Sequence, residues 1–269
     1  MPLPPALPPA PCLLAFDTST EHMALGVSVD AARHSRNAPG GAAASATLLP
    51  EVHALLAQAG LSLADLHAVA FGCGPGAFTG LRTACAVAQG LGYGLNLPLL
   101  PIDSLLIVAE DARLQAAPEA STLDVAVAMD ARMDEAYAAH YRWQDGQWQL
   151  LQAPGLYTLP ALAQAWQDAA VHLLAGSALL AFGDRLVLPA ARRVEVEADR
   201  AAALLRLAVA AALAGPGLPA EQALPLYLRD KVAQTTQERE ATKQGLLAQV
   251  AATATSAVTP ASTTAAPTA

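Results

Sequence analysis

Cysteine, aromatic and charged residues are all scarce in this chain of 269 residues. The three cysteines, Cys12, Cys73 and Cys85, are odd in number and form no C-x-x-C pair, which excludes a disulfide framework. They are predicted to be reduced core residues. Charged residues make up 14% of the chain and hydrophobic residues 54%, so the sequence is able to bury a large core.

Basic residues are also few. Fifteen Lys and Arg residues face 23 Asp and Glu residues, the net charge is −8, and only Arg192 and Arg193 are adjacent. Phosphate contacts require clustered cations, so this balance argues against a chain that holds nucleic acid by itself. Any role in nucleic-acid chemistry is expected to be indirect.

Targeting and membrane signals are missing as well. An apolar, uncharged segment, residues 83–102, contains three glycines and two prolines and is a poor membrane span. The proline-rich leader, residues 1–11, has no cationic start and does not read as a secretion signal. Cytoplasmic residence is expected. The tail, residues 241–269, is rich in alanine and threonine and is predicted to be disordered.

The motifs of common catalytic sites are absent. The six histidines include no H-x-x-x-H pair, no serine lies in a G-x-S-x-G elbow, and no histidine lies within five residues of Cys73 in the sequence. His53 is therefore expected to lie at the surface or at an interface. We predict no catalytic residue, no metal site and no cofactor.

The most distinctive stretch present is glycine-rich and runs from Val69 to Arg82. It joins an apolar run at 66–71 to a helical run at 78–95, so it predicts a strand–loop–helix corner. Two interpretations stay open. The glycines permit close packing of the backbone, or the exposed N–H groups at the helix start hold an anion, although no Gly-Lys-Ser/Thr ends the loop.

Around this corner the sequence predicts a repeated order of elements, βββαβα, with a link at 115–122. A helix at 45–59, capped by Ser45 or Thr47, and a helix beginning at Asp103 or Ser104 belong to the first copy. The first copy has strands at 12–16, 23–29, 31–36, 66–71 and 97–102; the second has strands at 123–129, 136–141, 147–151 and 170–175 and helices at 160–168 and 198–214.

Small residues recur every four positions on the second helix, at Gly80, Ala84, Ala88 and Gly92. Such a stripe lets another backbone approach closely. It is either ordinary packing against the sheet of the same half of the chain or a face for a second protein.

Residues 74–82, Gly-Pro-Gly-Ala-Phe-Thr-Gly-Leu-Arg, resemble the Gly-Pro-Gly-Ser-Phe-Thr-Gly-Leu/Val-Arg signature of the TsaB (YeaZ) family. Ala77 replaces the serine and removes a possible helix-cap hydroxyl. A second string, Pro-Leu-Tyr-Leu-Arg at 225–229, resembles the end of the same family, and the resemblance covers about 11–240. This family and its catalytic relative, the TsaD family, have the two-lobed α/β fold of actin, hexokinase and Hsp70 (the ASKHA fold), with duplicated βββαβα units.

The resemblance implies a non-catalytic subunit of the bacterial machinery that makes threonylcarbamoyladenosine in tRNA. In that family the partner is TsaD, which modifies the adenosine beside the anticodon in tRNAs reading codons that start with A; TsaE joins through the TsaB–TsaD complex, and tRNA is contacted only indirectly. A homodimer is expected when the chain is alone. The expected lobes are 12–114 and 115–240.

The resemblance also implies which residues meet the partner, on the first two helices of the amino-terminal lobe. The expected partner-binding residues are Leu49, His53, Leu56, Arg82, Ala86, Gln89 and Tyr93. The signature loop comprises Gly74, Pro75, Gly76, Phe78, Thr79, Gly80 and Arg82.

Two alternatives remain. One is an ATPase or small-molecule kinase of the same fold, with Asp17 as metal-binding carboxylate and Gly74–Gly80 as phosphate loop. Against it, the matching turn at Asp130-Ala131-Arg132 has no glycine, and both aspartates suit caps of tight turns. The other alternative is a homodimer with regulatory or chaperone-like duties.

Overall fold

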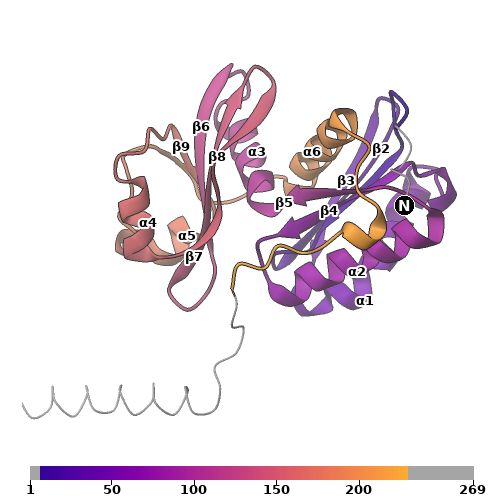
Figure 1. The fold of residues 1–269 in the computed structure, drawn as a ribbon, viewed down its shortest axis with the longest axis horizontal. Helices are drawn as coiled ribbons and strands as arrows, with labels where there is room; N and C mark the ends of the chain where they lie inside the picture. Colours follow the sequence, from indigo (N-terminus) through magenta and orange to yellow (C-terminus); the bar gives the residue numbers. More distant parts are fainter. Residues whose placement is uncertain (1–6, 230–269) are drawn as a thin grey trace, which may run out of the picture. The chain divides into compact units, whose positions relative to one another are not determined.

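The computed structural model describes residues 7–229, which contain two mixed five-stranded sheets with helices (Figure 1). The first sheet has the order β3-β2-β1-β4-β5 and the second the order β10-β9-β6-β7-β8. The strands are β1 Leu13–Asp17, β2 His22–Val29, β3 Ala32–Pro39, β4 Ala68–Gly74, β5 Leu99–Asp103, β6 Thr122–Asp130, β7 Glu135–Gln144, β8 Gln147–Thr158, β9 Leu173–Ala175 and β10 Arg192–Val194. The helices are α1 Ala44–Gln58, α2 Phe78–Leu95, α3 Ser104–Ala116, α4 Leu159–Trp166, α5 Ala178–Phe182 and α6 Arg200–Ala214, with 3-10 turns η1 Gly41–Ala43, η2 Leu63–Asp65, η3 Gly183–Arg185 and η4 Ala220–Gln222.

The predicted duplicated α/β architecture is confirmed. In each sheet the first strand of the copy, β1 or β6, pairs antiparallel with the second strand and parallel with the fourth. Each copy continues beyond βββαβα with one more strand and one more helix, β5 and α3 or β10 and α6. The helix predicted at 198–214 is therefore the counterpart of α3. The lobe boundaries themselves stay a prediction.

A matching pair of histidines repeats in the two copies. The backbone N–H of Cys12 donates to Nδ1 of His67 at 2.8 Å, and the N–H of Asp124 donates to Nδ1 of His172 at 3.1 Å. In return, the backbone N–H of His67 donates to the carbonyl of Cys12, and the backbone N–H of His172 donates to the carbonyl of Asp124. Each histidine lies just before the fourth strand of its copy and fastens that strand to the first, so the duplication extends to individual hydrogen bonds.

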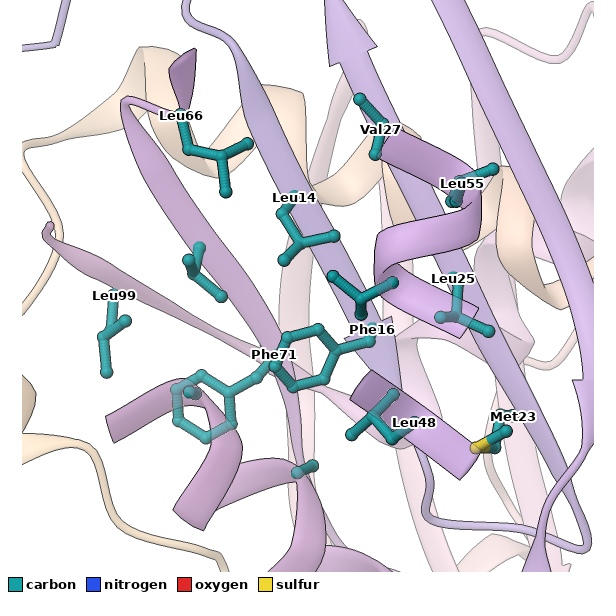
Figure 2. Packing of buried hydrophobic residues seen from close by; sticks show 14 of the residues in the cluster. Leu14, Phe16, Met23, Leu25, Val27, Leu48, Leu55, Leu66, Phe71 and Leu99 are labelled. Carbon is teal, nitrogen blue, oxygen red and sulfur yellow. The ribbon is translucent and has the colours of Figure 1, made fainter. Parts of the chain in front are cut away.

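The first sheet has apolar side chains on both faces. On β1, Leu14 and Phe16 point toward α1 and α2, where Phe71 and Leu48 join them (Figure 2). The alternate residues Leu13 and Ala15 point to the opposite face, which packs against α6. Because strand side chains alternate, a strand covered on both faces is a continuous apolar run. Burial of one large apolar side chain stabilises the fold by about 1.5–3 kcal/mol.

The last helix of each copy packs against the sheet of the other copy. α6 follows the second sheet in sequence but contacts β1, β2, β3 and β5 of the first sheet. α3 follows the first sheet, and its Leu105, Val108 and Ala112 belong to a core with Val125 and Val127 of the second. The two helices also contact each other.

The small-residue stripe on α2 faces inward. Ala84 and Ala88 are fully buried, and a Cβ at Gly80 would overlap the carbonyl oxygen of Thr18. At the other end of the stripe, a Cβ at Gly92 would lie 3.1 Å from that of Ala220. Of the two interpretations, packing within the chain is the one observed.

Helix capping follows the sequence in part. Asp103 caps α3 by accepting the N–H of Leu105 at 2.9 Å, as predicted. The expected cap of α1 by Ser45 or Thr47 is wrong: α1 begins after η1 with Ala43 at the N-cap, and the Thr47 hydroxyl donates to the Ala43 carbonyl within the helix. Ala77 is the N-cap of α2 and offers no side-chain bond.

Several smaller expectations can be compared with residues 7–229. Cys12 and Cys85 are buried and Cys73 is half-buried, all three as free thiols. Within this range no helix has the length and apolarity to cross a membrane. The predicted disordered tail, 241–269, and residues 1–6 of the leader lie outside the described residues.

His140 gives a testable pH dependence. It is buried within β7, its Nε2 has no hydrogen-bond partner among residues 7–229, and burial lowers its pKa. The unfolded chain then binds a proton that the folded chain lacks, so the free energy of unfolding should fall as the pH drops below the ordinary histidine pKa of about 6.5. Urea unfolding at several pH values measures this slope. His140→Leu should flatten it and the exposed control His22→Leu should not; an unchanged slope in His140→Leu would contradict the assignment.

Candidate functional site

The signature loop lies at the corner between β4 and α2 and packs against the turn that follows β1. The N–H of Ala77 donates to the carbonyl of Ser19 at 2.8 Å, and the Thr18 hydroxyl donates to the carbonyl of Gly80 at 2.7 Å. A Cβ at Gly76 would lie 2.6 Å from the Ser19 carbonyl oxygen. The glycines are needed because two stretches of backbone touch here.

The Asp17 carboxylate lies at the centre of this packing and is completely buried. One oxygen accepts the Ser19 N–H at 3.0 Å and the Ser19 hydroxyl at 2.7 Å. The other accepts the Ser104 hydroxyl at 2.7 Å, and the Gly74 N–H donates to that same hydroxyl oxygen at 3.1 Å. A single carboxylate thus fastens the turn after β1, the start of α3 and the signature loop.

Arg200, the first residue of α6, neutralises this carboxylate. Its guanidinium lies 3.3 Å from Asp17 Oδ1 and 2.7 Å from Glu197 Oε2, and it also donates to the Ser19 hydroxyl and the Ser104 carbonyl. Burial alone lowers the pKa of Arg200, but the charges of Glu197 and Asp17 outweigh burial and raise it. The arginine stays charged, so Asp17 has an internal cation as its partner.

The corresponding turn of the second copy is also closed on itself. The Arg132 N–H donates to Asp130 Oδ1 at 2.7 Å, as the Ser19 N–H does to Asp17. Three successive residues, Arg132, Met133 and Asp134, have φ of 65°, 57° and 58°, a conformation rare for residues other than glycine. Both aspartates therefore cap tight turns. Among residues 7–229 no group of three or more His, Cys, Asp or Glu side chains could hold a metal ion.

The surroundings of Cys73 disfavour the thiolate form. Burial raises the pKa of its thiol to about 12, and the nearby negative charges of Asp103 and Asp17 add to the effect. The pKa of Asp103 is raised by burial too, although Tyr141 donates a hydrogen bond to its carboxylate at 2.6 Å. A thiol must lose its proton to attack a carbonyl, so this raised pKa disfavours reaction of Cys73 at neutral pH.

A carboxy-terminal strap, Ala220–Leu228, runs along α2. Its Ala223 carbonyl accepts a hydrogen bond from Gln89 at 2.8 Å, and its Leu226 N–H donates to the Cys73 carbonyl at 2.7 Å. Near the start of α2, the ring of Tyr227, the next residue of the strap, lies 5.1 Å from the ring of Phe78. The strap is drawn in orange beside α2 in Figure 1. The two strings that carry the family resemblance therefore touch, which neither string indicates alone.

The expected partner-binding residues divide into three groups. Leu49 and Tyr93 are 43% and 62% exposed, and His53, Ala86 and Arg82 are also exposed. Gln89 is half-buried and bonded to the strap. Leu56 is only 2% exposed and belongs to the core, so its assignment to a partner surface is wrong: it lies on the inward face of α1 with Val52 and Leu55.

The signature-loop residues are mostly internal. Gly74, Pro75 and Gly80 are buried, and Gly76 and Phe78 are half-buried. Thr79 and Arg82, which follow on α2, are exposed. The loop thus positions the start of α2, and only its last residues reach the surface.

Comparison with known proteins places this geometry in a family. The sequence model of the TsaD family, described as tRNA N6-adenosine threonylcarbamoyltransferase, matches residues 38–163. The Haemophilus influenzae tRNA threonylcarbamoyladenosine biosynthesis protein TsaB is 40% identical over 126 residues, which span 46% of this chain and about half (51%) of that protein. The Escherichia coli TsaB is 31% identical over 240 residues, or 82% of this chain and 96% of that protein.

A solved structure agrees with these matches. YeaZ from Pseudomonas aeruginosa superimposes with a TM-score of 0.73 at 37% identity, over 81% of this chain and 100% of that one. The fold, the signature loop with its packed glycines, and the strap that closes on it thus occur in a chain of which 82% aligns with the Escherichia coli protein and 81% superimposes on the Pseudomonas aeruginosa structure. The chain belongs to the TsaB (YeaZ) family of tRNA threonylcarbamoyladenosine biosynthesis proteins.

Proposed function

We propose that this chain is a non-catalytic subunit that binds a TsaD-type transferase through the outward faces of α1 and α2. The observation that carries the proposal is the buried Asp17–Arg200 pair, which occupies the carboxylate that an ATP-using member of this fold would offer to a metal ion. A site with no available carboxylate and no open glycine loop has little chemistry of its own, and a scaffolding role remains.

The kinase alternative has little support in this geometry. The Thr18–Ser19 backbone covers Gly76 and Gly80, so a phosphate would have to displace part of the chain to reach their amides. In the second copy, the residues of the matching turn include Arg132 and Met133 in place of glycine, and both have positive φ. Turnover of ATP by the isolated chain would contradict the non-catalytic role.

The outward faces of α1 and α2 suit a protein partner. They carry exposed Leu49 and Tyr93 with small Ala86 between larger neighbours, and apolar and aromatic anchors of this kind dominate binding energies at interfaces. Both helices lie within the residues that match the TsaD family model, so a TsaD-type partner would present a related pair of helices. Related faces pair readily about a near two-fold axis. The same faces would support a homodimer when the chain is alone.

This proposal assigns tRNA contact to the partner. The net charge of −8 gives this chain no electrostatic advantage in holding a polyanion. In the proposed assembly the transferase binds the tRNA, this chain supports the transferase, and a TsaE-type ATPase joins only once both are assembled.

The test is size-exclusion chromatography with light scattering of the full chain mixed with the TsaD-type transferase of the same organism. A one-to-one complex is expected, and Tyr93→Glu should weaken it by about tenfold or more because a charge replaces an apolar anchor. Leu180→Glu on α5, at a side chain that is 59% exposed, is the matched control and should bind like the parent. Failure of the parent chain to form any complex would overturn the proposal.

A further inference from the structure

We propose that Arg82, held in place by Phe78 and Tyr227, receives a carboxylate from the partner subunit. These three residues are called the Arg82 cluster below. The inference rests on the proposed function and names the chemistry of one of its contacts. It draws on the strap, which the sequence did not connect with the partner surface.

The guanidinium is fixed before any partner arrives. Its Cζ lies 4.0 Å from the centre of the Phe78 ring, and its Nε donates to the Tyr227 hydroxyl at 3.3 Å. A cation over an aromatic face is attracted to it, and an arginine already held in one orientation loses less entropy when it binds. Tyr227 is thus a positioning residue for Arg82.

The binding edge of the arginine is still available. Its terminal nitrogens, Nη1 and Nη2, have no hydrogen-bond partner in the part of the chain that the structure describes, and the side chain is exposed. Two parallel N–H groups match the two oxygens of a carboxylate, and such forked pairs are stronger and more directional than neutral hydrogen bonds. The cluster therefore presents a positively charged guanidinium whose two terminal nitrogens can bind a carboxylate.

The surroundings favour a carboxylate carried by a protein over a free anion. Tyr227 is itself 42% exposed, and two other apolar side chains of the strap, Leu224 and Leu226, are 69% and 37% exposed. A small anion would leave these apolar side chains in water, whereas an acidic side chain on a partner helix brings apolar neighbours to cover them. The strap is anchored through Leu226 and Ala223, so this surface exists in the free chain.

The test measures the affinity of the full chain for the TsaD-type transferase at low and high salt. Arg82→Gln should weaken binding by about tenfold or more and remove part of the salt dependence. Arg82→Glu should bind more weakly than Arg82→Gln, because it places like charges together, and Arg82→Lys should rescue only partly because it lacks the fork. Tyr227→Phe, which removes only the hydroxyl, should cost about twofold to fivefold.

The control is Arg185→Gln, which removes another exposed arginine lying near a phenylalanine, 5.9 Å from the Phe182 ring. It should bind like the parent chain. A parent chain that binds while Arg82→Gln and Arg82→Glu bind equally well overturns this inference alone. A lowered melting temperature of free Arg82→Gln with unchanged affinity also overturns it, since the arginine would then serve its own fold. A parent chain that does not bind overturns the proposed function together with this inference.

Discussion

Replacing Arg200 with alanine is expected to lower the free energy of unfolding by about 3–5 kcal/mol, the cost of leaving a buried charge without its partner. The Asp17 carboxylate is completely buried and would keep its hydrogen bonds from Ser19 and Ser104 but lose its cation. The half-buried Glu197 would lose the same partner. Urea unfolding followed by circular dichroism measures the change.

Two variants sharpen this prediction. Arg206→Ala removes an exposed arginine from the same helix and should change stability little, because exposed charges contribute about 0–1 kcal/mol. The double variant Asp17→Asn with Arg200→Met removes both charges and should recover much of the loss, since neither partner is then left alone. Equal stability of the parent chain and Arg200→Ala would show that Asp17 does not depend on the arginine.

Ala88→Arg should prevent folding. Ala88 is fully buried on the inward face of α2, where the apolar core cluster of the first sheet leaves no room for a longer side chain. Both an overpacked core and an unpaired buried charge result, which together cost more than about 4–5 kcal/mol, a large share of the stability of a typical domain. The expected result is insoluble protein or a chain without a cooperative thermal transition.

Ala86→Arg is the matched comparison because it makes the same substitution two residues away on the exposed face. It should fold normally and lose the complex with the transferase, since the new charge would enter the proposed interface. Together the two variants separate the inward face of α2 from its outward face. A folded Ala88→Arg chain that fails to bind would assign the small-residue stripe to the partner after all.

Local patterns in the sequence were enough to predict most of the fold. Apolar runs located nine of the ten strands that the structure describes in residues 7–229, and the strand–turn–strand pattern around Asp17 and Asp130 revealed the repeat. β3 and β8, which are edge strands, are longer than predicted. The ends beyond the predicted ranges, 37–39 and 152–158, contain proline or glycine, which in a sequence indicate a turn. β10 and α5 were missed, being three and five residues long and too short to show a period.

The site was predicted less completely because its contacts join distant residues. Asp17 and Arg200 are 183 positions apart, and Arg82 and Tyr227 are 145 apart. No spacing rule connects such residues. An aspartate at the end of a buried strand, such as Asp17, does indicate that a cationic partner is needed, but it does not indicate which residue that partner is. Leu56 was misplaced for a related reason: α1 is apolar over a wide arc, and periodicity alone does not distinguish the inner edge of that arc from the outer.

Because α3 packs on the second sheet and α6 on the first, the repeated stretch of sequence and the unit that folds are not the same. Each copy ends in a helix whose apolar face packs against the sheet of the other copy. An isolated copy would therefore expose one face of its sheet and the apolar face of its last helix. The repeated stretch, which ends with α3 in the first copy and with α6 in the second, is therefore not expected to fold by itself. Because α3 and α6 each pack against the sheet of the other copy, the two copies are expected to unfold together. A substitution that destabilises one copy should therefore lower the stability of both.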